Sequence, residues 1–319
     1  MKRNLREERH KVATVQGGQL FVHRIEPEQS RGVVLMLHGL GSSAQAFLGT
    51  DRGLAPYLAE MGYTCLVVDL IGHGQSWPLP SRKLKHGLST IINEDLPRLV
   101  ADARRSAKGQ GIFLIGQGLG GALLASAYAA HASVRPGVVG MVHFGARRAI
   151  SRQTGPAAFW WRQVMPLLGA LLGKVPLHWF RLAAEAENIS LYREFLSWSR
   201  GEWVDPEAPE MDFTEAARVL DWPASLYFAR RKGGYADQLQ DVREFIRGIG
   251  THNARLLVLG RKEGNLHNYR FDQLTRHDDA WVDHFPLLLD WMNEHLKDSG
   301  TGRNRPHLKL VNGQPRPKG

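Results

Sequence analysis

The stretch Phe113-Leu114-Ile115-Gly116-Gln117-Gly118-Leu119-Gly120-Gly121 decides the fold of this chain. An apolar run leads directly into a glycine-rich turn, and a segment of small and apolar residues follows it. This pattern predicts a buried strand, a sharp turn with Gly118 at its tip, and a helix that starts immediately after the turn. The small residues on either side of the tip allow the strand and the helix to approach each other closely.

A turn of this kind holds a strained serine in sequences of the form G-x-S-x-G, where the serine side chain serves as a nucleophile. Gly118 stands at the place of that serine. Glycine offers no atom for attack, so we expect acyl-enzyme chemistry at this turn to be lost. Ser126 lies two helical turns beyond Gly118 and is expected to be packed, so it offers no substitute.

Two further motifs precede this turn. Residues 33–37 form an apolar run that ends at His38-Gly39-Leu40-Gly41, and residues 65–69 form a second run that leads to Gly72-His73-Gly74-Gln75-Ser76. The order of these motifs resembles the α/β-hydrolase superfamily over roughly residues 18 to 295. The resemblance implies an α/β fold in which a mostly parallel, twisted sheet is flanked by helices and carries a helical cap insertion.

The resemblance also implies a division of the chain. We expect a first part of the core in residues 1–149, a helical cap in 150–218, the second part of the core in 219–296 and a disordered basic tail in 297–319. With 319 residues, 43% of them hydrophobic, the chain can bury one large core and still carry an insertion. The cap region is rich in tryptophan, which either packs the cap on the core or forms an apolar face: Trp160, Trp161, Trp179, Trp198 and Trp203.

The charge is strongly positive, with a formal net value of +10. No Asp or Glu lies between Asp102 and Glu185, whereas ten Arg and Lys residues do. Such a field suits an anionic ligand, an anionic membrane surface or nucleic acid, and nucleic acid is disfavoured because no binding motif accompanies the charge. With no signal peptide, no spanning segment and one cysteine, Cys65, the sequence predicts a cytoplasmic protein.

The remaining members of a hydrolytic triad are sought further along the chain, in the order acid and then histidine. Residues 275–281 resemble the H-x-D…W context of the catalytic histidine in acid lipases, which makes His277 the candidate base. The acid of those lipases aligns near Gly233 and is therefore lost as well. Asp237 is the remaining candidate for an acid that bends back to His277.

An anion-binding corner is expected to survive the loss of the serine. The resemblance places the N–H groups of Leu40 and Leu119 toward one point at the start of a helix, with Gly39 and Gln117 beside them. Without the serine side chain, that corner gains room for a carboxylate, phosphate or enolate. The same combination of hydrolase-like fold and elbow glycine resembles the N-myc downstream-regulated family, which is regarded as non-catalytic.

Two enzyme hypotheses compete with this interpretation. Gly116-x-Gly118-x-x-Gly121 also matches a dinucleotide fingerprint, with Arg147 and Arg148 suited to the 2′-phosphate of NADP. A strand order of 3-2-1-4-5-6 would favour it, and an order of 1-2-4-3-5-6-7-8 would exclude it. In the second hypothesis the protein is still an enzyme on this scaffold, either a hydrolase of carboxylic esters or lipids or a lyase-type enzyme in which His277 acts as a base.

The sequence therefore predicts a non-hydrolytic member of the α/β-hydrolase superfamily that binds an apolar molecule with an anionic head, or else a protein partner. We expect no metal and no cofactor. The sequence leaves open the identity of the ligand, the acid, the oligomeric state and whether any catalysis remains.

Overall fold

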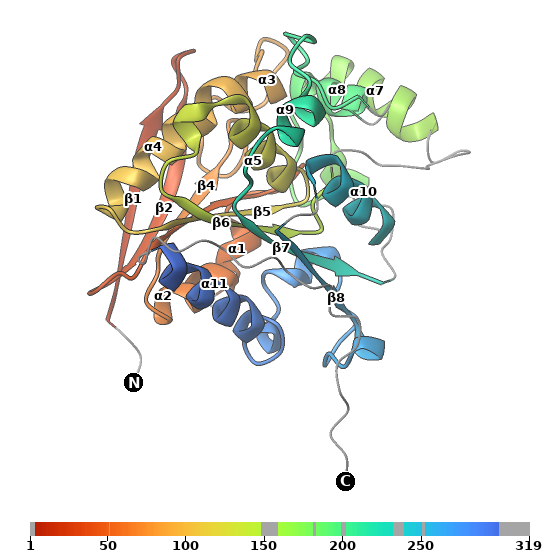
Figure 1. The fold of residues 1–319 in the computed structure, drawn as a ribbon. Coiled ribbons are helices and arrows are strands. Elements are labelled where there is room, and N and C mark those ends of the chain that lie inside the picture. Colours follow the sequence, from red (N-terminus) through yellow and green to blue (C-terminus); the bar gives the residue numbers. More distant parts are fainter. Residues whose placement is uncertain are drawn as a thin grey trace.

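The computed structural model describes residues 4–50, 52–147, 159–180, 183–198, 202–231, 239–250 and 253–299. A sheet of eight strands in the order β1-β2-β4-β3-β5-β6-β7-β8 crosses the molecule (Figure 1). Its strands are β1 (Leu5–Ala13), β2 (Gln19–Pro27), β3 (Val33–Leu37), β4 (Thr64–Asp69), β5 (Ile112–Gln117), β6 (Val138–Phe144), β7 (Ala224–Arg230) and β8 (Ala254–Leu259).

The sheet has an antiparallel part at one edge and a parallel part across the rest. β1 pairs antiparallel with β2, and β2 pairs antiparallel with β4, whereas every pair from β4 to β8 is parallel. Parallel neighbours need crossover connections, which helices provide here. The expected α/β-hydrolase fold is thus confirmed. The strand order also excludes the dinucleotide-binding alternative, because that domain has the order 3-2-1-4-5-6.

Helices cover both faces of the sheet (Figure 1). The apolar runs alternate between the faces: Leu35 and Leu114 pack on one side, and Met36 and Ile115 on the other. One face is covered by α1 (Gln45–Leu48), α2 (Leu54–Glu60) and α11 (Phe285–Ser299). The other carries α3 (Leu88–Thr90), the π-helical turn η1 (Ile91–Asp95), α4 (Leu96–Ala107), α5 (Leu119–Ala130), α9 (Phe213–Arg218) and α10 (Leu239–Ile249).

A helical insertion lies between β6 and β7, as expected for a cap. It contains η3 (Trp160–Val164), α7 (Met165–Leu172), η4 (Leu177–Phe180) and α8 (Ile189–Trp198). Met165, Val175 and Tyr192 form a small apolar cluster of their own within it. Further along the insertion, Trp198 and Trp203 are fully buried and join the main core.

Exposed apolar side chains lie on the other part of the insertion. Trp160 and Trp179 expose 46% and 61% of their surface, and Leu171 exposes 68%. The tryptophans therefore divide between the two roles expected for them. Trp198 and Trp203 pack the insertion on the core, Trp160 and Trp179 face solvent, and Trp161 is partly buried against the small cluster of the insertion. Among the described residues, no helix is both long and apolar enough to cross a membrane.

Cys65 and Ser126 have the structural roles expected of them. The thiol of Cys65 is fully buried in β4, and burial raises its pKa well above the usual range, so it stays protonated. Ser126 is also fully buried. Its hydroxyl donates to the carbonyl of Ala122 and accepts from the indole N–H of Trp203.

Candidate active-site corner

The tip of the glycine turn has a backbone conformation that favours glycine. Gly118 joins β5 to α5 with φ of 54° and ψ of −120°, a region that costs an L-residue strain. The turn is also tightly packed on both sides. A Cβ on Gly116 would lie 2.4 Å from Cα of Gly121, and a Cβ on Gly120 would lie 2.3 Å from the carbonyl oxygen of Leu37. These glycines therefore serve the close approach of strand and helix, which was the role predicted for them.

The aromatic ring of Phe271 occupies the space in front of Gly118. A Cβ built on Gly118 would lie 2.9 Å from Cζ of Phe271, closer than carbon atoms approach in proteins. Phe271 begins the short helix η6 (Phe271–Leu274). The expectation that loss of the serine enlarges this corner is therefore wrong, because a phenyl ring fills the place where a nucleophile would project.

Gln117 fastens the segment of Phe271 to the end of β5. Its amide N–H₂ donates to the carbonyl of Phe271 over 3.3 Å and to the hydroxyl of Thr275 over 3.2 Å. The Thr275 hydroxyl donates in turn to the carbonyl of Ala46 over 2.7 Å. Gln117, predicted to contact a ligand, is thus a buried side chain that holds Phe271 against the turn.

The His-Gly loop lies against the turn as the resemblance implied. A Cβ on Gly39 would lie 2.8 Å from the carbonyl oxygen of Gln117 and 3.4 Å from the amide nitrogen of Leu119. The imidazole of His38 fixes the loop: its Nδ1 donates to the carbonyl of Gly39, and its Nε2 accepts from the N–H of Leu70. Burial lowers the pKa of His38 to about 4, so this ring is neutral at pH 7.

The cap insertion reaches the same loop through Glu187. The N–H of Gly41 donates to Oε2 of this buried carboxylate over 2.8 Å, and Nε2 of His73 lies 3.2 Å from the same oxygen. Burial alone would raise the pKa of Glu187, but the charge of His73 and the N–H donors lower it overall. Burial alone would lower the pKa of His73, but the charge of Glu187 raises the pKa of His73 overall. Both shifts favour the charged form of the group, so the pair ties the cap to the His-Gly loop through opposite charges.

Asp69 connects the His-Gly loop to the following turn. Its carboxylate accepts from the N–H of Ala44 over 2.7 Å and from the N–H of Gln75 over 3.0 Å. Ser76 completes this link, because its hydroxyl donates to the carbonyl of Asp69 and accepts from the N–H of Phe21. The loop that carries Gly39 and Leu40 is therefore held from both sides.

His277, the predicted base, has contacts outside this corner. Its Nδ1 accepts from the N–H of Asp279 over 3.2 Å, so the ring caps the short helix η7 (Asp278–Trp281). Its ring packs against His267 and Tyr269, with centroids 4.8 and 5.3 Å away. Asp237, the candidate acid, falls outside the described residues. The described part of the chain thus brings Gly39, Gln117 and Leu119 together around Gly118, with Phe271 as the aromatic ring that faces it.

Two residues of this site were missed by the sequence analysis. Phe271 looks like an ordinary core residue, and no local pattern shows that it meets a turn 153 positions earlier. Glu187 carries no motif either, and the nearby Glu185 gives the sequence no means of telling which of the two carboxylates is buried. Both roles depend on long-range contacts.

Comparisons with known proteins agree with the fold. The family model described as serine aminopeptidase, S33, matches residues 28–200, more than half of the chain. None of the curated proteins matches it. Among solved structures, the chain is similar to a soluble variant of monoglyceride lipase from Saccharomyces cerevisiae, with 16% identity, a TM-score of 0.64 and coverage of 92% of this chain and 96% of the lipase.

Two further structures show the same fold. An α/β hydrolase named GrgF from Penicillium sp. is 16% identical, with a TM-score of 0.62 and coverage of 92% and 98%. A putative aryl esterase from Burkholderia cenocepacia is also 16% identical, with a TM-score of 0.59 and coverage of 91% and 100%. The chain therefore belongs to the serine aminopeptidase S33 family and, by its sheet and its glycine turn, to the α/β-hydrolase superfamily.

Proposed function

We propose that this protein binds an apolar ligand with an anionic head and does not hydrolyse it. The observation that carries the proposal is the ring of Phe271 seated against Gly118. Ester hydrolysis by this fold needs a nucleophile at the tip of the turn and a base beside it. Here the tip has no side chain, and a hydrocarbon ring stands in front of it.

The backbone donors that would bind the anionic head lie close together. Gly39 lies against the backbone of Leu119, which brings the His-Gly loop next to the first turn of α5. N–H groups at a helix start favour a negative group, because they carry the positive end of the helix dipole. Arg147 follows β6 at the same edge of the sheet and adds positive charge, offset in part by Asp241 at 4.0 Å.

The apolar part of the ligand would lie between the His-Gly loop and the insertion. Leu40 packs against both the main core and the small cluster of the insertion. It is half-buried, so it borders both apolar regions while part of its surface remains accessible. A ligand whose carboxylate binds at the N–H of Leu119 would therefore place its apolar chain beside Leu40.

A proline substitution that removes the backbone N–H of Leu119 tests this proposal. Leu119 is the first residue of α5, a position where proline fits a helix while lacking an N–H. Dodecanoate and dodecanol, which differ only in the head group, are titrated against wild type, Leu119→Pro and Leu119→Ala. We expect the acid to bind more tightly than the alcohol in wild type and Leu119→Ala, and Leu119→Pro to weaken the acid alone by about 10-fold or more.

Equal binding of acid and alcohol by wild type would contradict the proposed anion site. Loss of dodecanoate binding in Leu119→Ala as well as Leu119→Pro would assign the effect to lost packing of the leucine. Circular dichroism of each variant shows whether its helices remain intact. A protein partner, the other occupant considered from the sequence, would leave both molecules unbound.

The comparisons favour a second candidate, hydrolysis of a carboxylic ester. The solved structures named above are hydrolases or lipases by their descriptions, and the matched family is a peptidase family. In this case His277 would act as the base, as an esterase or in lyase-type chemistry, and an activated water would replace the serine. The two candidates differ in one observable, the turnover of simple esters.

A further inference from the structure

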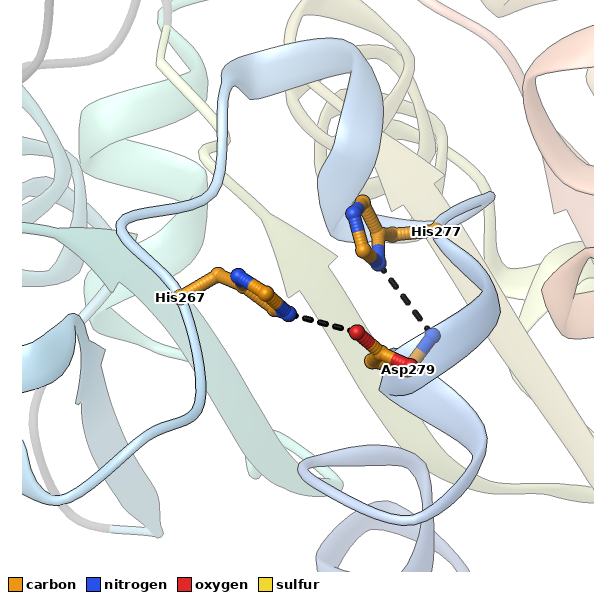
Figure 2. A group of neighbouring side chains, drawn as sticks. All are labelled: His267, His277 and Asp279. Atoms are coloured by element: carbon orange, nitrogen blue, oxygen red, sulfur yellow. Dashed lines mark hydrogen bonds and ion pairs between the residues drawn. The ribbon is translucent and has the colours of Figure 1, made fainter.

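Two histidines and a carboxylate meet in a cluster that takes no part in the Gly118 corner (Figure 2). His267 lies in the loop between η5 (Arg261–Glu263) and η6, His277 directly precedes η7, and Asp279 lies in η7. Each offers one coordinating atom, and these atoms all lie within 4.8 Å of one another. Two separate segments of the chain thus bring together three side chains that can bind a metal ion.

The contacts within the cluster place the three donors around one point. Nε2 of His267 lies 2.5 Å from Oδ2 of Asp279, and the two imidazole rings have centroids 4.8 Å apart. Figure 2 shows the carboxylate of Asp279 between the two rings. The short contact between His267 and Asp279 holds one proton, and a cation can take the place of that proton between the same two atoms.

Independent contacts hold the two segments together. The hydroxyl of Tyr269 donates to Oδ2 of Asp283 over 2.5 Å, and the amide of Asn265 donates to Oδ1 of the same carboxylate over 3.0 Å. The ring of Tyr269 also packs edge-on against both His267 and His277. The loop of His267 is therefore fixed on the segment of His277 by groups that are not themselves ligands, as in the outer shell of metal sites.

The cluster is open to solvent on one side. The side chains of His267 and Asp279 expose 37% and 47% of their surface. A cation can therefore enter without unfolding the chain, and a water molecule can reach it. This exposure suits a site with three protein ligands and one open position.

We propose that His267, His277 and Asp279 bind a divalent transition-metal cation, and that Zn²⁺ is the ion of best fit. Two imidazoles and one carboxylate are ligands that zinc prefers, whereas Mg²⁺ and Ca²⁺ require sets of oxygen atoms. Tetrahedral zinc at about 2.0–2.2 Å from each ligand places the ligand atoms ~3.3 Å apart. When the ion binds, the distance between Nε2 of His267 and Oδ2 of Asp279 increases slightly, and the longer distances between ligand atoms decrease. A water molecule supplies the fourth ligand.

The cation joins the loop of His267 to the start of η7. On binding, it takes the place of the proton between Nε2 of His267 and Asp279, and that proton moves through solvent to Nδ1 of the same ring. Nδ1 of His277 exchanges its backbone N–H donor for the metal. Because the three donors converge only in the folded chain, binding raises the stability of the folded state. The cation thus links two segments of the folded chain while one of its positions stays open to water, and its binding does not depend on the function proposed for the Gly118 corner.

Cobalt titration tests the site, because four-coordinate Co²⁺ absorbs visible light and follows zinc in its ligands. The full chain without an affinity tag is stripped of metal with EDTA, desalted, and titrated with Co²⁺ and then with Zn²⁺. The variants are His267→Ala, His277→Ala and Asp279→Asn. His10→Ala is the matched control, because Nε2 of His10 contacts Asp102 over 2.8 Å, and among the described residues this pair belongs to no group of three possible metal ligands.

We expect one Co²⁺ per chain with visible absorption that Zn²⁺ displaces, and affinity at least ~10-fold lower in each of the three variants but unchanged in His10→Ala. Zinc should also raise the melting temperature of wild type and His10→Ala only. Absence of the cobalt spectrum in wild type, or equal binding in wild type, His267→Ala and Asp279→Asn, would overturn the proposal. Should His277→Ala fail to fold, the other two variants still decide the result, because they leave the cap of η7 intact.

Discussion

The ring of Phe271 lies where a side chain on Gly118 would project, with 2.9 Å between Cζ and the position of a Cβ. Gln117 and Thr275 hold this arrangement through three hydrogen bonds. In hydrolases of this fold the turn holds a nucleophile in a strained backbone conformation. Here glycine adopts that conformation without strain, and the aromatic ring of Phe271 covers the tip of the turn.

Gly118→Ala should destabilise the protein for two separable reasons. The sparsely populated backbone conformation of Gly118 costs an alanine about 1–3 kcal/mol, and contact with the ring of Phe271 adds to that cost. In a Phe271→Ala background, the same substitution should cost about 1 kcal/mol less. Urea unfolding of the four proteins measures this coupling, and strict additivity would show that the ring does not limit the space at residue 118.

Gly118→Ser alone should gain no esterase activity and no labelling by a fluorophosphonate. The new hydroxyl would meet a phenyl ring rather than a base, and among the described residues no carboxylate accepts a hydrogen bond from the ring of His277, whose Nδ1 accepts from the N–H of Asp279. Adding Phe271→His supplies an imidazole beside the serine, so Gly118→Ser/Phe271→His should label faster than the control Gly118→Ser/Phe271→Ala. Strong labelling of Gly118→Ser that His277→Ala abolishes would instead identify His277 as the base.

Glu187→Gln should loosen the insertion from the His-Gly loop. The amide oxygen of glutamine still accepts from the N–H of Gly41, but the charge that faces His73 is gone. Removing one partner of a buried ion pair costs about 3 kcal/mol in proteins. We expect a loss of this size for Glu187→Gln in chemical unfolding, and a larger loss for Glu187→Ala. Wild-type stability of Glu187→Gln would contradict the ionised pair.

Glu194 should make stability fall as the pH rises. Burial raises its pKa to about 7, while the N–H of Ser89 donates to it over 3.2 Å. Because the folded pKa exceeds the unfolded value of 4.5, the stability contribution is complete below pH 4.5 and is lost as the pH rises through 7. Glu194→Gln should match wild type near pH 4.5 and exceed it by about 2 kcal/mol at pH 8.

Melting curves at both pH values measure this difference. The sign is the decisive part, because an ordinary exposed glutamate gives the same difference between variant and wild type at both values. A wild-type protein that is more stable than Glu194→Gln at pH 8 would mean that the carboxylate is favourably paired in its charged form.

Much of the fold was predictable from short apolar runs and the glycine turns between them. The runs at residues 33–37 and 112–117 are strands with both faces covered, so they are apolar throughout and easily identified. The glycine motifs then fix where strand and helix pack backbone to backbone, as Gly116 and Gly121 do. These are local properties, and a sequence records them directly.

The candidate site was only partly predictable. Gly118, Gly39 and Leu119 follow from motifs, and the structure brings them together. The role of Phe271 depends instead on a contact between segments far apart in the chain, and a phenylalanine carries no sign of such a partner. The sequence context of His277 predicts a catalytic base, whereas its observed contacts are with His267, Tyr269 and Asp279.

The most direct measurement is the turnover of p-nitrophenyl esters, from acetate to palmitate, by purified wild type and His277→Ala. With no nucleophile at Gly118 and the ring of Phe271 in front of it, both proteins should release nitrophenol at the rate of buffer alone. Turnover above that rate in wild type, abolished in His277→Ala, would contradict the non-hydrolytic account and assign the base to His277.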